Sequence, residues 1–295
     1  MEIGRVGVWT RTDGLQIGES AEFARSVEAL GYGALWIPDA FGRDPFAHAA
    51  WLFSQTTSLV VATGVVNIHL REAQATACAQ RALHDQSGGR FLLGLGVSHG
   101  TVIESMFKKP YPAPLPSMRS YLDAMQAAMW WGPELSGEPP IVLAALGPGM
   151  LALAAERTRG AHPYFAPPEN TERSRKIMGE GAWLCPEQKL LLETDPVRAR
   201  ERARMAMAGP LTMPNYRRNL MRCGFEEAEL DDGGNDRVVD AVVAWGDLDA
   251  LVQRVQDHLD AGASHVCIQP LDADHPTRPS VELLEALAPR LCGDR

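Results

Sequence analysis

Short apolar runs alternate with helix-like segments along most of the chain. Each run is four to eight residues long and rich in Val, Leu and Ile, whereas the segments between them place apolar residues three or four positions apart. Phe23, Val27 and Leu30, for example, fall on one helical face. The apolar runs predict strands at residues 6–9, 34–37, 59–66, 91–97, 141–145, 160–165, 188–192 and 265–269. Such alternation is typical of βα units around a parallel sheet.

The eight apolar runs define eight such units. We predict helices at residues 20–30, 48–54, 73–87, 117–130, 150–157, 247–261 and 281–291. Residues 108–116 contain too many prolines for a helix or strand interior and are expected to form a loop. Residues 205–236 exceed a minimal unit and hold short helical pieces at 213–217 and 225–228. The predicted fold is α/β, a (β/α)8 TIM barrel with insertions after strands 4 and 7, in a single domain spanning residues 1–295.

Composition narrows the classes of function. A net charge of −9 and a pI near 5.4 argue against a nucleic-acid partner, which needs a basic face. No apolar run approaches the roughly 20 residues that span a bilayer, and the first residues do not resemble a secretion signal. Five cysteines without a CxxC pair suggest reduced thiols. We therefore expect a cytoplasmic enzyme that acts on a small molecule, with no membrane partner.

Two glycine-containing segments carry candidate binding chemistry. Gly64 interrupts an otherwise β-branched strand, which indicates a bulge or the close approach of a ligand, although tight packing in the barrel would also explain it. The Gly147–Pro148–Gly149 turn opens a helix and offers free backbone N–H groups to an anion, or else serves as a structural turn only. The sequence contains no HxH, HExxH or CxxC motif, so we predict no metal site.

Several motifs in order along the chain resemble the luciferase-like flavin and deazaflavin superfamily. They occupy residues 31–39, 62–65, 89–97, 118–124 and 144–150. The resemblance implies a bulge near Gly64, often with a non-prolyl cis peptide, that presses on one face of the cofactor ring. It also implies that the cofactor phosphate binds at Gly147–Gly149.

The same resemblance places Asp39 near the polar edge of the ring. Many F420-dependent dehydrogenases of the family follow this carboxylate with a catalytic histidine, but here the next residue is Ala40. His99 is then the leading group for proton transfer, and the alternative is that it only hydrogen-bonds the cofactor. His69 and His162 are secondary candidates. We predict Asp39 and His99 as catalytic residues and a cofactor site made of Asp39, Thr63, Gly64, Val65, Asn67, Gly96, Ser98, His99, Gly147, Pro148, Gly149 and Met150.

The resemblance favours an F420-dependent oxidoreductase that transfers hydride between the deazaflavin and a small organic substrate. Two alternatives stay open: an FMN-dependent monooxygenase that uses reduced flavin and O2, and a non-catalytic flavin-binding protein. Basic residues are available for the acidic tail of F420, namely Lys108, Lys109, Arg173, Arg175 and Lys176. We further expect a homodimer, and a reductase that supplies reduced F420 or flavin.

Overall fold

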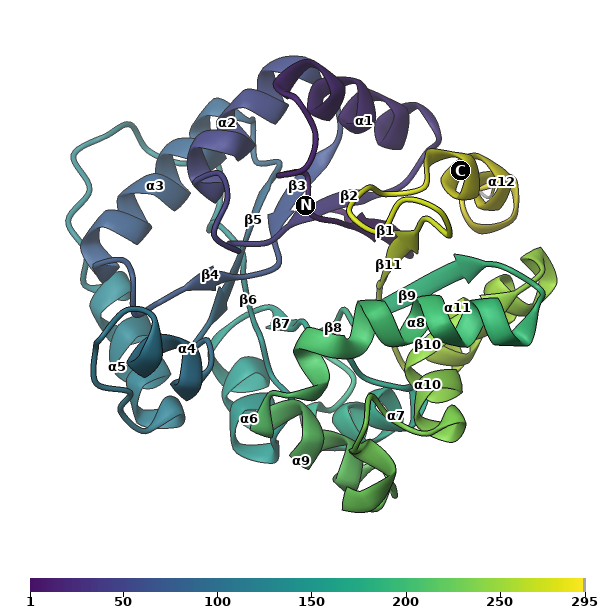
Figure 1. Cartoon of the computed structure of the whole chain (residues 1–295). Coiled ribbons are helices and arrows are strands. Elements are labelled where there is room, and N and C mark those ends of the chain that lie inside the picture. Colours follow the sequence, from purple (N-terminus) through teal and green to yellow (C-terminus); the bar gives the residue numbers. More distant parts are fainter. Residues whose placement is uncertain (294–295) are drawn as a thin grey trace.

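The computed structural model describes residues 1–293, and a curled parallel sheet surrounded by helices forms its centre (Figure 1). Every ladder between named strands is parallel. The strand order is β10-β9-β11-β1-β2-β3-β5-β6-β7-β8, with β4 paired to β5. The strands are β1 (Val6–Trp9), β2 (Ala34–Ile37), β3 (Val60–Thr63), β4 (Val66–Asn67), β5 (Phe91–Gly96), β6 (Ile141–Leu143), β7 (Gly160–Ala161), β8 (Trp183–Leu184), β9 (Glu187–Leu192), β10 (Val243–Gly246) and β11 (Val266–Leu271).

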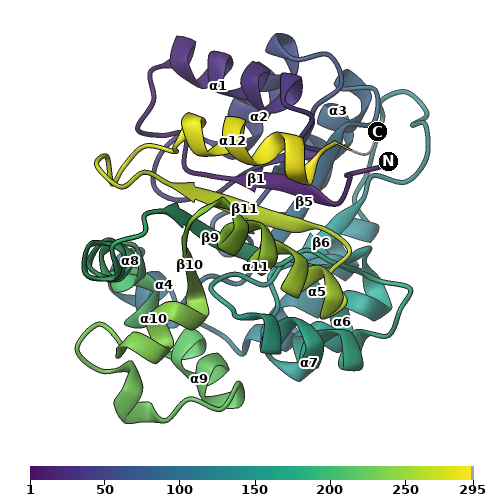
Figure 2. The same cartoon turned by 90° about the vertical axis from the view of Figure 1, so that its right-hand side faces the viewer.

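Helices lie on the outside of the curled sheet, as both views show (Figures 1 and 2). They are α1 (Ile17–Ala29), α2 (Pro45–Gln55), α3 (Ala73–Gln86), α4 (Gly100–Ser105), α5 (Pro114–Gln126), α6 (Pro148–Arg157), α7 (Pro168–Met178), α8 (Pro196–Leu211), α9 (Pro214–Arg222), the 3-10 helix η1 (Glu227–Leu230), α10 (Asp236–Val242), α11 (Leu248–Asp260) and α12 (Val281–Leu291). Within residues 1–293, no helix combines the length and apolar character needed to cross a bilayer.

The chain between β8 and β9 connects one end of the strand order, β8, with β9, which lies next to the other end. Only Cys185 and Pro186 separate these strands. Cys185 N–H donates to Ala161 O at the end of β7 (2.8 Å), whereas Pro186 O accepts from Cys267 N–H in β11 (2.8 Å). One continuous segment is therefore hydrogen-bonded to strands on both sides, and the sheet curls round on itself.

Alternation along the strands separates two apolar layers. Leu35 and Leu93 belong to the large cluster that packs beneath the helices. Trp36 and Leu92, one residue along in each strand, belong to a smaller cluster with Trp9. Because successive strand side chains point to opposite faces, this second cluster fills the inside of the curled sheet.

The α/β class and the parallel sheet are confirmed, while several boundaries differ from the prediction. The strand expected at residues 59–66 is interrupted, because Gly64 and Val65 separate β3 from β4. The proline-rich loop is shorter than predicted: Pro114 begins α5, where a proline lacks only an N–H that the first turn leaves unpaired anyway. Residues 205–236 contribute α9 and η1 near the predicted pieces.

Candidate active site

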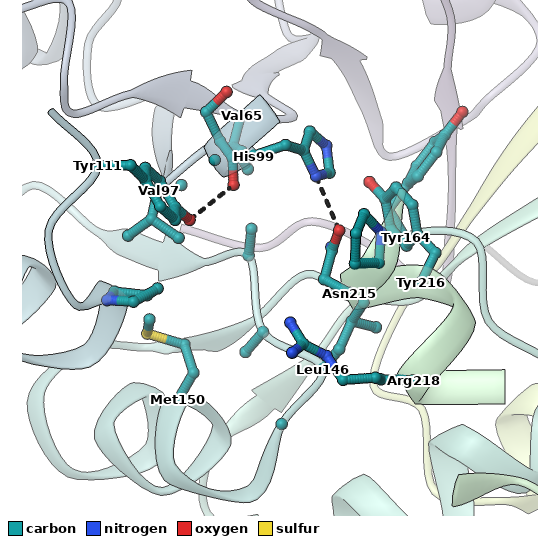
Figure 3. Close-up of a pocket in the computed structure, with 18 of the residues that line it drawn as sticks. Val65, Val97, His99, Tyr111, Leu146, Met150, Tyr164, Asn215, Tyr216 and Arg218 are labelled. Carbon is teal, nitrogen blue, oxygen red and sulfur yellow. Dashed lines mark hydrogen bonds between the residues drawn. The ribbon is translucent and has the colours of Figure 1, made fainter. Parts of the chain in front are cut away.

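A pocket of about 590 Å³ opens where β5, β6 and β7 end (Figure 3). The segments that follow these strands form one wall, and residues of α9 form another. Since parallel strands end at the same edge of a sheet, this is the place where barrel enzymes bind their substrates. Six predicted residues line it: Val65, Gly96, Ser98, His99, Gly147 and Met150.

His99 lies in the pocket wall and is held by a side chain from a distant part of the sequence. Its Nδ1 is 2.8 Å from Oδ1 of Asn215 on α9, and the rings of His99 and Tyr216 lie 5.3 Å apart (Figure 3). Burial lowers the pKa of His99, although the Asn215 hydrogen bond opposes this effect. The imidazole is therefore neutral near pH 7 and suited to accept a proton.

Ser98 adopts a backbone conformation that is unusual for a residue with a side chain. Its φ is 57°, in the left-handed region. Tyr111 Oη donates to Ser98 O (3.2 Å), so the phenol fixes this turn from across the pocket. Strained residues of this kind cluster at functional sites, and here the turn places His99 directly after β5.

The far end of the pocket is suited to an anion. Gly147 precedes α6, whose first internal hydrogen bond runs from Leu151 N–H to Gly147 O (3.0 Å). The N–H groups of the first turn consequently have no partner within the helix. Arg218 and Arg222 from α9 line the same pocket, and neither forms an ion pair with any residue in the 1–293 range. Two guanidinium groups and the residue that precedes a helix thus line the same pocket, and Arg222 Nη1 would lie 3.9 Å from a Cβ at Gly147.

His162 lies in the pocket wall, but one nitrogen of its ring faces the inside of the sheet. Its Nδ1 donates to Cys185 O (2.7 Å), and its ring stacks on Trp36 with 4.5 Å between centroids. Burial lowers the pKa of His162 to about 4, so the ring is neutral. Its Nε2 is buried without a hydrogen-bond partner in the described chain. An ideal Cβ at Gly64 would lie 3.1 Å from this nitrogen, so the nitrogen faces the packed interior beside Gly64.

The other predicted residues lie outside the pocket lining: Asp39, Thr63, Gly64, Asn67, Pro148 and Gly149. Asp39 is ion-paired with Arg71 and accepts from the backbone N–H of Asn67 (3.2 Å). Thr63 is fully buried, and its hydroxyl bridges to both Gly94 O (2.9 Å) and Gly94 N (2.8 Å). These hydrogen bonds join neighbouring segments of the sheet. The positions of Asp39 and Thr63 are therefore explained by local structure without a ligand.

Gly64 precedes a cis peptide bond to Val65, the feature that the family resemblance implied. Packing inside the sheet explains why this residue is a glycine. An ideal Cβ there would lie 2.6 Å from Trp9 Nε1 and 3.1 Å from His162 Nε2, inside the sheet, whereas Val65 lines the pocket. Glycine is required at position 64 because Trp9, which donates to Gly64 O (3.1 Å), approaches so closely.

We therefore expect Gly64→Val to destabilise the fold by about 1–3 kcal/mol, the usual cost of overpacking a core. Urea unfolding of this variant and of Val65→Ala measures the effect, and cofactor binding is compared in the variants that fold. An unchanged midpoint for Gly64→Val would contradict the packing explanation.

The basic residues proposed from the sequence lie elsewhere. Lys109 donates to His69 O (3.1 Å), and Lys176 is paired with Glu172 on the surface. Arg173 binds Asn219 Oδ1 (2.7 Å), and Arg175 binds Gly262 O (2.9 Å). None of the five predicted basic residues lines the pocket, whereas Arg218 and Arg222 do.

A buried ion pair lies beside the pocket residue Tyr164. Glu187 and Lys189 on β9 are each about 1% exposed, and the Lys189 ammonium is 3.1 Å from both carboxylate oxygens. The same ammonium lies 4.1 Å from the centre of the Tyr164 ring. Burial raises the pKa of Glu187 and lowers that of Lys189, and each charge counteracts the shift of the other.

A family model for luciferase-like monooxygenases matches residues 3–183, more than half of the chain. The chain belongs to this family. A relative in Mycobacterium tuberculosis, named as a coenzyme F420-dependent oxidoreductase, is 30% identical over 208 residues, which is 57% of this chain and 59% of the relative. The match thus spans less than two thirds of that protein's length.

Two solved structures share the fold of this chain. The coenzyme F420-dependent tetrahydromethanopterin reductase of Methanopyrus kandleri superposes with a TM-score of 0.78 at 18% identity, covering 99% of this chain and 100% of that one. An FMN-bound type II Baeyer–Villiger monooxygenase component of Pseudomonas putida superposes with a TM-score of 0.69 at 15% identity, covering 99% of each chain. At these identities the likeness concerns the fold alone.

Proposed function

We propose that this protein is an F420-dependent oxidoreductase that transfers hydride between the deazaflavin and a small organic substrate. The observation that carries the proposal is the anion-binding end of the pocket, where Arg218, Arg222 and the N-terminus of α6 meet. F420 carries a phosphate and several glutamate carboxylates, so it offers an anion to each of these groups. The M. tuberculosis relative supports the same cofactor.

The remaining walls fit a ring and a reacting substrate. Val65 and Met150 provide apolar surface for the ring or the substrate. F420, when bound, supplies the hydride chemistry, while the protein orients the reactants and excludes water. His99 would accept or return the proton that accompanies hydride transfer. We further propose that the curled sheet is a variant of the (β/α)8 barrel. We also propose that the protein forms a homodimer and that a reductase supplies its reduced cofactor.

An FMN-dependent monooxygenase is the second candidate, because the FMN-bound neighbour shares the fold. One phosphate at the α6 N-terminus would satisfy FMN, but it would leave part of the Arg218 and Arg222 charge without a partner. Fluorescence titration distinguishes the two: we expect F420 to bind at micromolar affinity or better and FMN at least tenfold more weakly. Tighter binding of FMN would favour the monooxygenase.

Two double variants that each remove two positive charges test whether the pocket arginines bind the cofactor. Arg218→Gln with Arg222→Gln should weaken F420 on the order of 10- to 30-fold, since each exposed charge pair contributes up to about 1 kcal/mol. Lys108→Gln with Lys109→Gln also removes two positive charges, but from outside the pocket lining. If both double variants weakened F420 binding equally, the effect would be one of general charge. Arg218 and Arg222 would then no longer support the proposed function.

A further inference from the structure

The contact between His99 and Asn215 determines more than the position of a ring. Nδ1 of His99 faces Oδ1 of Asn215 at 2.8 Å, and among residues 1–293 Nε2 of His99 has no hydrogen-bond partner. Neutral imidazole carries one N–H and one lone pair, and an amide oxygen can only accept a hydrogen bond. If Nδ1 donates to Asn215, the lone pair must therefore be at Nε2.

We propose that Asn215 is a positioning residue that holds His99 in its Nδ1–H tautomer and so presents a bare Nε2 to the substrate. The inference rests on the proposed function, because it specifies how the proton-handling group of that site is prepared. A base that carries its proton on the wrong nitrogen cannot accept the substrate's proton without a prior exchange. The partner of the second nitrogen thus decides which atom is reactive.

The placement of α9 supports this role. Tyr216, the neighbour of Asn215, packs its ring against His99, Tyr164 and Phe165, with centroids 5.3, 5.9 and 5.4 Å apart. Three aromatic contacts at the first turn of α9 restrict how far Asn215 can move from His99. The hydrogen bond is therefore built into the packing, and it does not depend on a flexible side chain reaching across solvent.

Few charges around His99 compete with this hydrogen bond. The titratable groups that share the pocket are Glu104 on α4, Tyr111 before α5, His162 and Tyr164 after β7, and Tyr216, Arg218 and Arg222 on α9. The pKa of His99 responds chiefly to burial and to Asn215. Changing Asn215 should therefore produce a clear change in the ring's titration.

The test uses the full chain without cofactor or substrate, labelled with 15N at histidine. Long-range proton–nitrogen correlation spectra report the tautomer, and the His99 signals are assigned by their loss in His99→Gln; the chain has eight histidines. The variants are Asn215→Leu, which removes the acceptor at similar size, and Asn215→Asp, which keeps an acceptor oxygen and adds charge. Aspartate near the start of a helix is also favourable, so this variant is expected to fold.

We expect the Nδ1–H tautomer in the wild type and in Asn215→Asp, and its loss in Asn215→Leu. A carboxylate beside the ring should raise the pKa of His99 by roughly one unit or more, whereas Asn215→Leu should lower it. An Nε2–H tautomer in the wild type would overturn the proposal, as would an unchanged tautomer in folded Asn215→Leu. Should Asn215→Leu not fold, the wild-type tautomer and the Asn215→Asp titration still decide.

These outcomes are independent of the cofactor. The expected tautomers in a protein that binds neither F420 nor FMN would leave the Asn215 inference standing and reject the proposed function. F420 binding together with an Nε2–H tautomer of His99 would support the proposed function and reject the Asn215 inference.

Discussion

His99→Ala is expected to lower kcat by roughly 10²–10⁴-fold while F420 stays bound, the usual range for loss of a general acid–base group. The side chain lies in the pocket wall, half-buried and hydrogen-bonded to Asn215, and its lowered pKa keeps it neutral at pH 7. The anion-binding end of the pocket, at Arg218 and Arg222, does not involve His99. The His99→Ala variant should therefore lose proton transfer but keep F420 binding.

The rate constant is followed by the deazaflavin absorbance with substrates drawn from a panel of alcohols, ketones and unsaturated compounds. His275→Ala is the matched control, since His275 is exposed and lies outside the pocket lining. Added imidazole should restore part of the rate in His99→Ala only. Weakened F420 binding with little change in kcat would instead identify His99 as a cofactor ligand.

Lys189→Met is expected to destabilise the protein by about 3–5 kcal/mol, because it leaves the Glu187 carboxylate buried without its partner. Both residues are about 1% exposed, so water cannot take over the role of Lys189. Replacing both, as Glu187→Gln with Lys189→Met, should recover much of the loss. Urea unfolding at fixed pH measures all three proteins.

The loss should also depend on pH in a definite direction. Without Lys189 the pKa of Glu187 rises further above that of the unfolded chain, so the folded state binds the additional proton. Stability of the variant should then fall as the pH rises above about 4.3, the ordinary pKa of Glu. Lys176→Met, which breaks a surface pair, should cost little at any pH. A flat pH dependence for Lys189→Met would show that Glu187 finds another partner.

Local pattern was sufficient to predict most of the fold. The strands at residues 6–9 and 34–37 and the helix at 281–291 were predicted with the observed bounds, because each has a clear period and a defined end. The run at 59–66 was predicted as one strand, since β-branched residues continue past Gly64. Periodicity cannot reveal a break that depends on the approach of Trp9 from another strand.

Part of the candidate site could likewise be predicted from the sequence, and part could not. His99 and Gly147 come two residues after the ends of predicted strands, so the order of elements alone places them at the pocket. Asn215, Arg218 and Arg222 were missed, because they come from an insertion whose position depends on tertiary packing. The available signal was their spacing in the segment after Pro214. Arg218 comes three residues after Asn215, and Arg222 comes four residues after Arg218, which puts all three on one face of a short helix.

That helix lies outside the segment that the family model matches. Residues within the matched part supply β1 to β7, the α6 N-terminus and His99, whereas α9 supplies Asn215 and the two arginines of the pocket lining. A change in this single nine-residue element would therefore alter the proposed proton-handling and anion-binding groups together, while leaving the sheet unchanged.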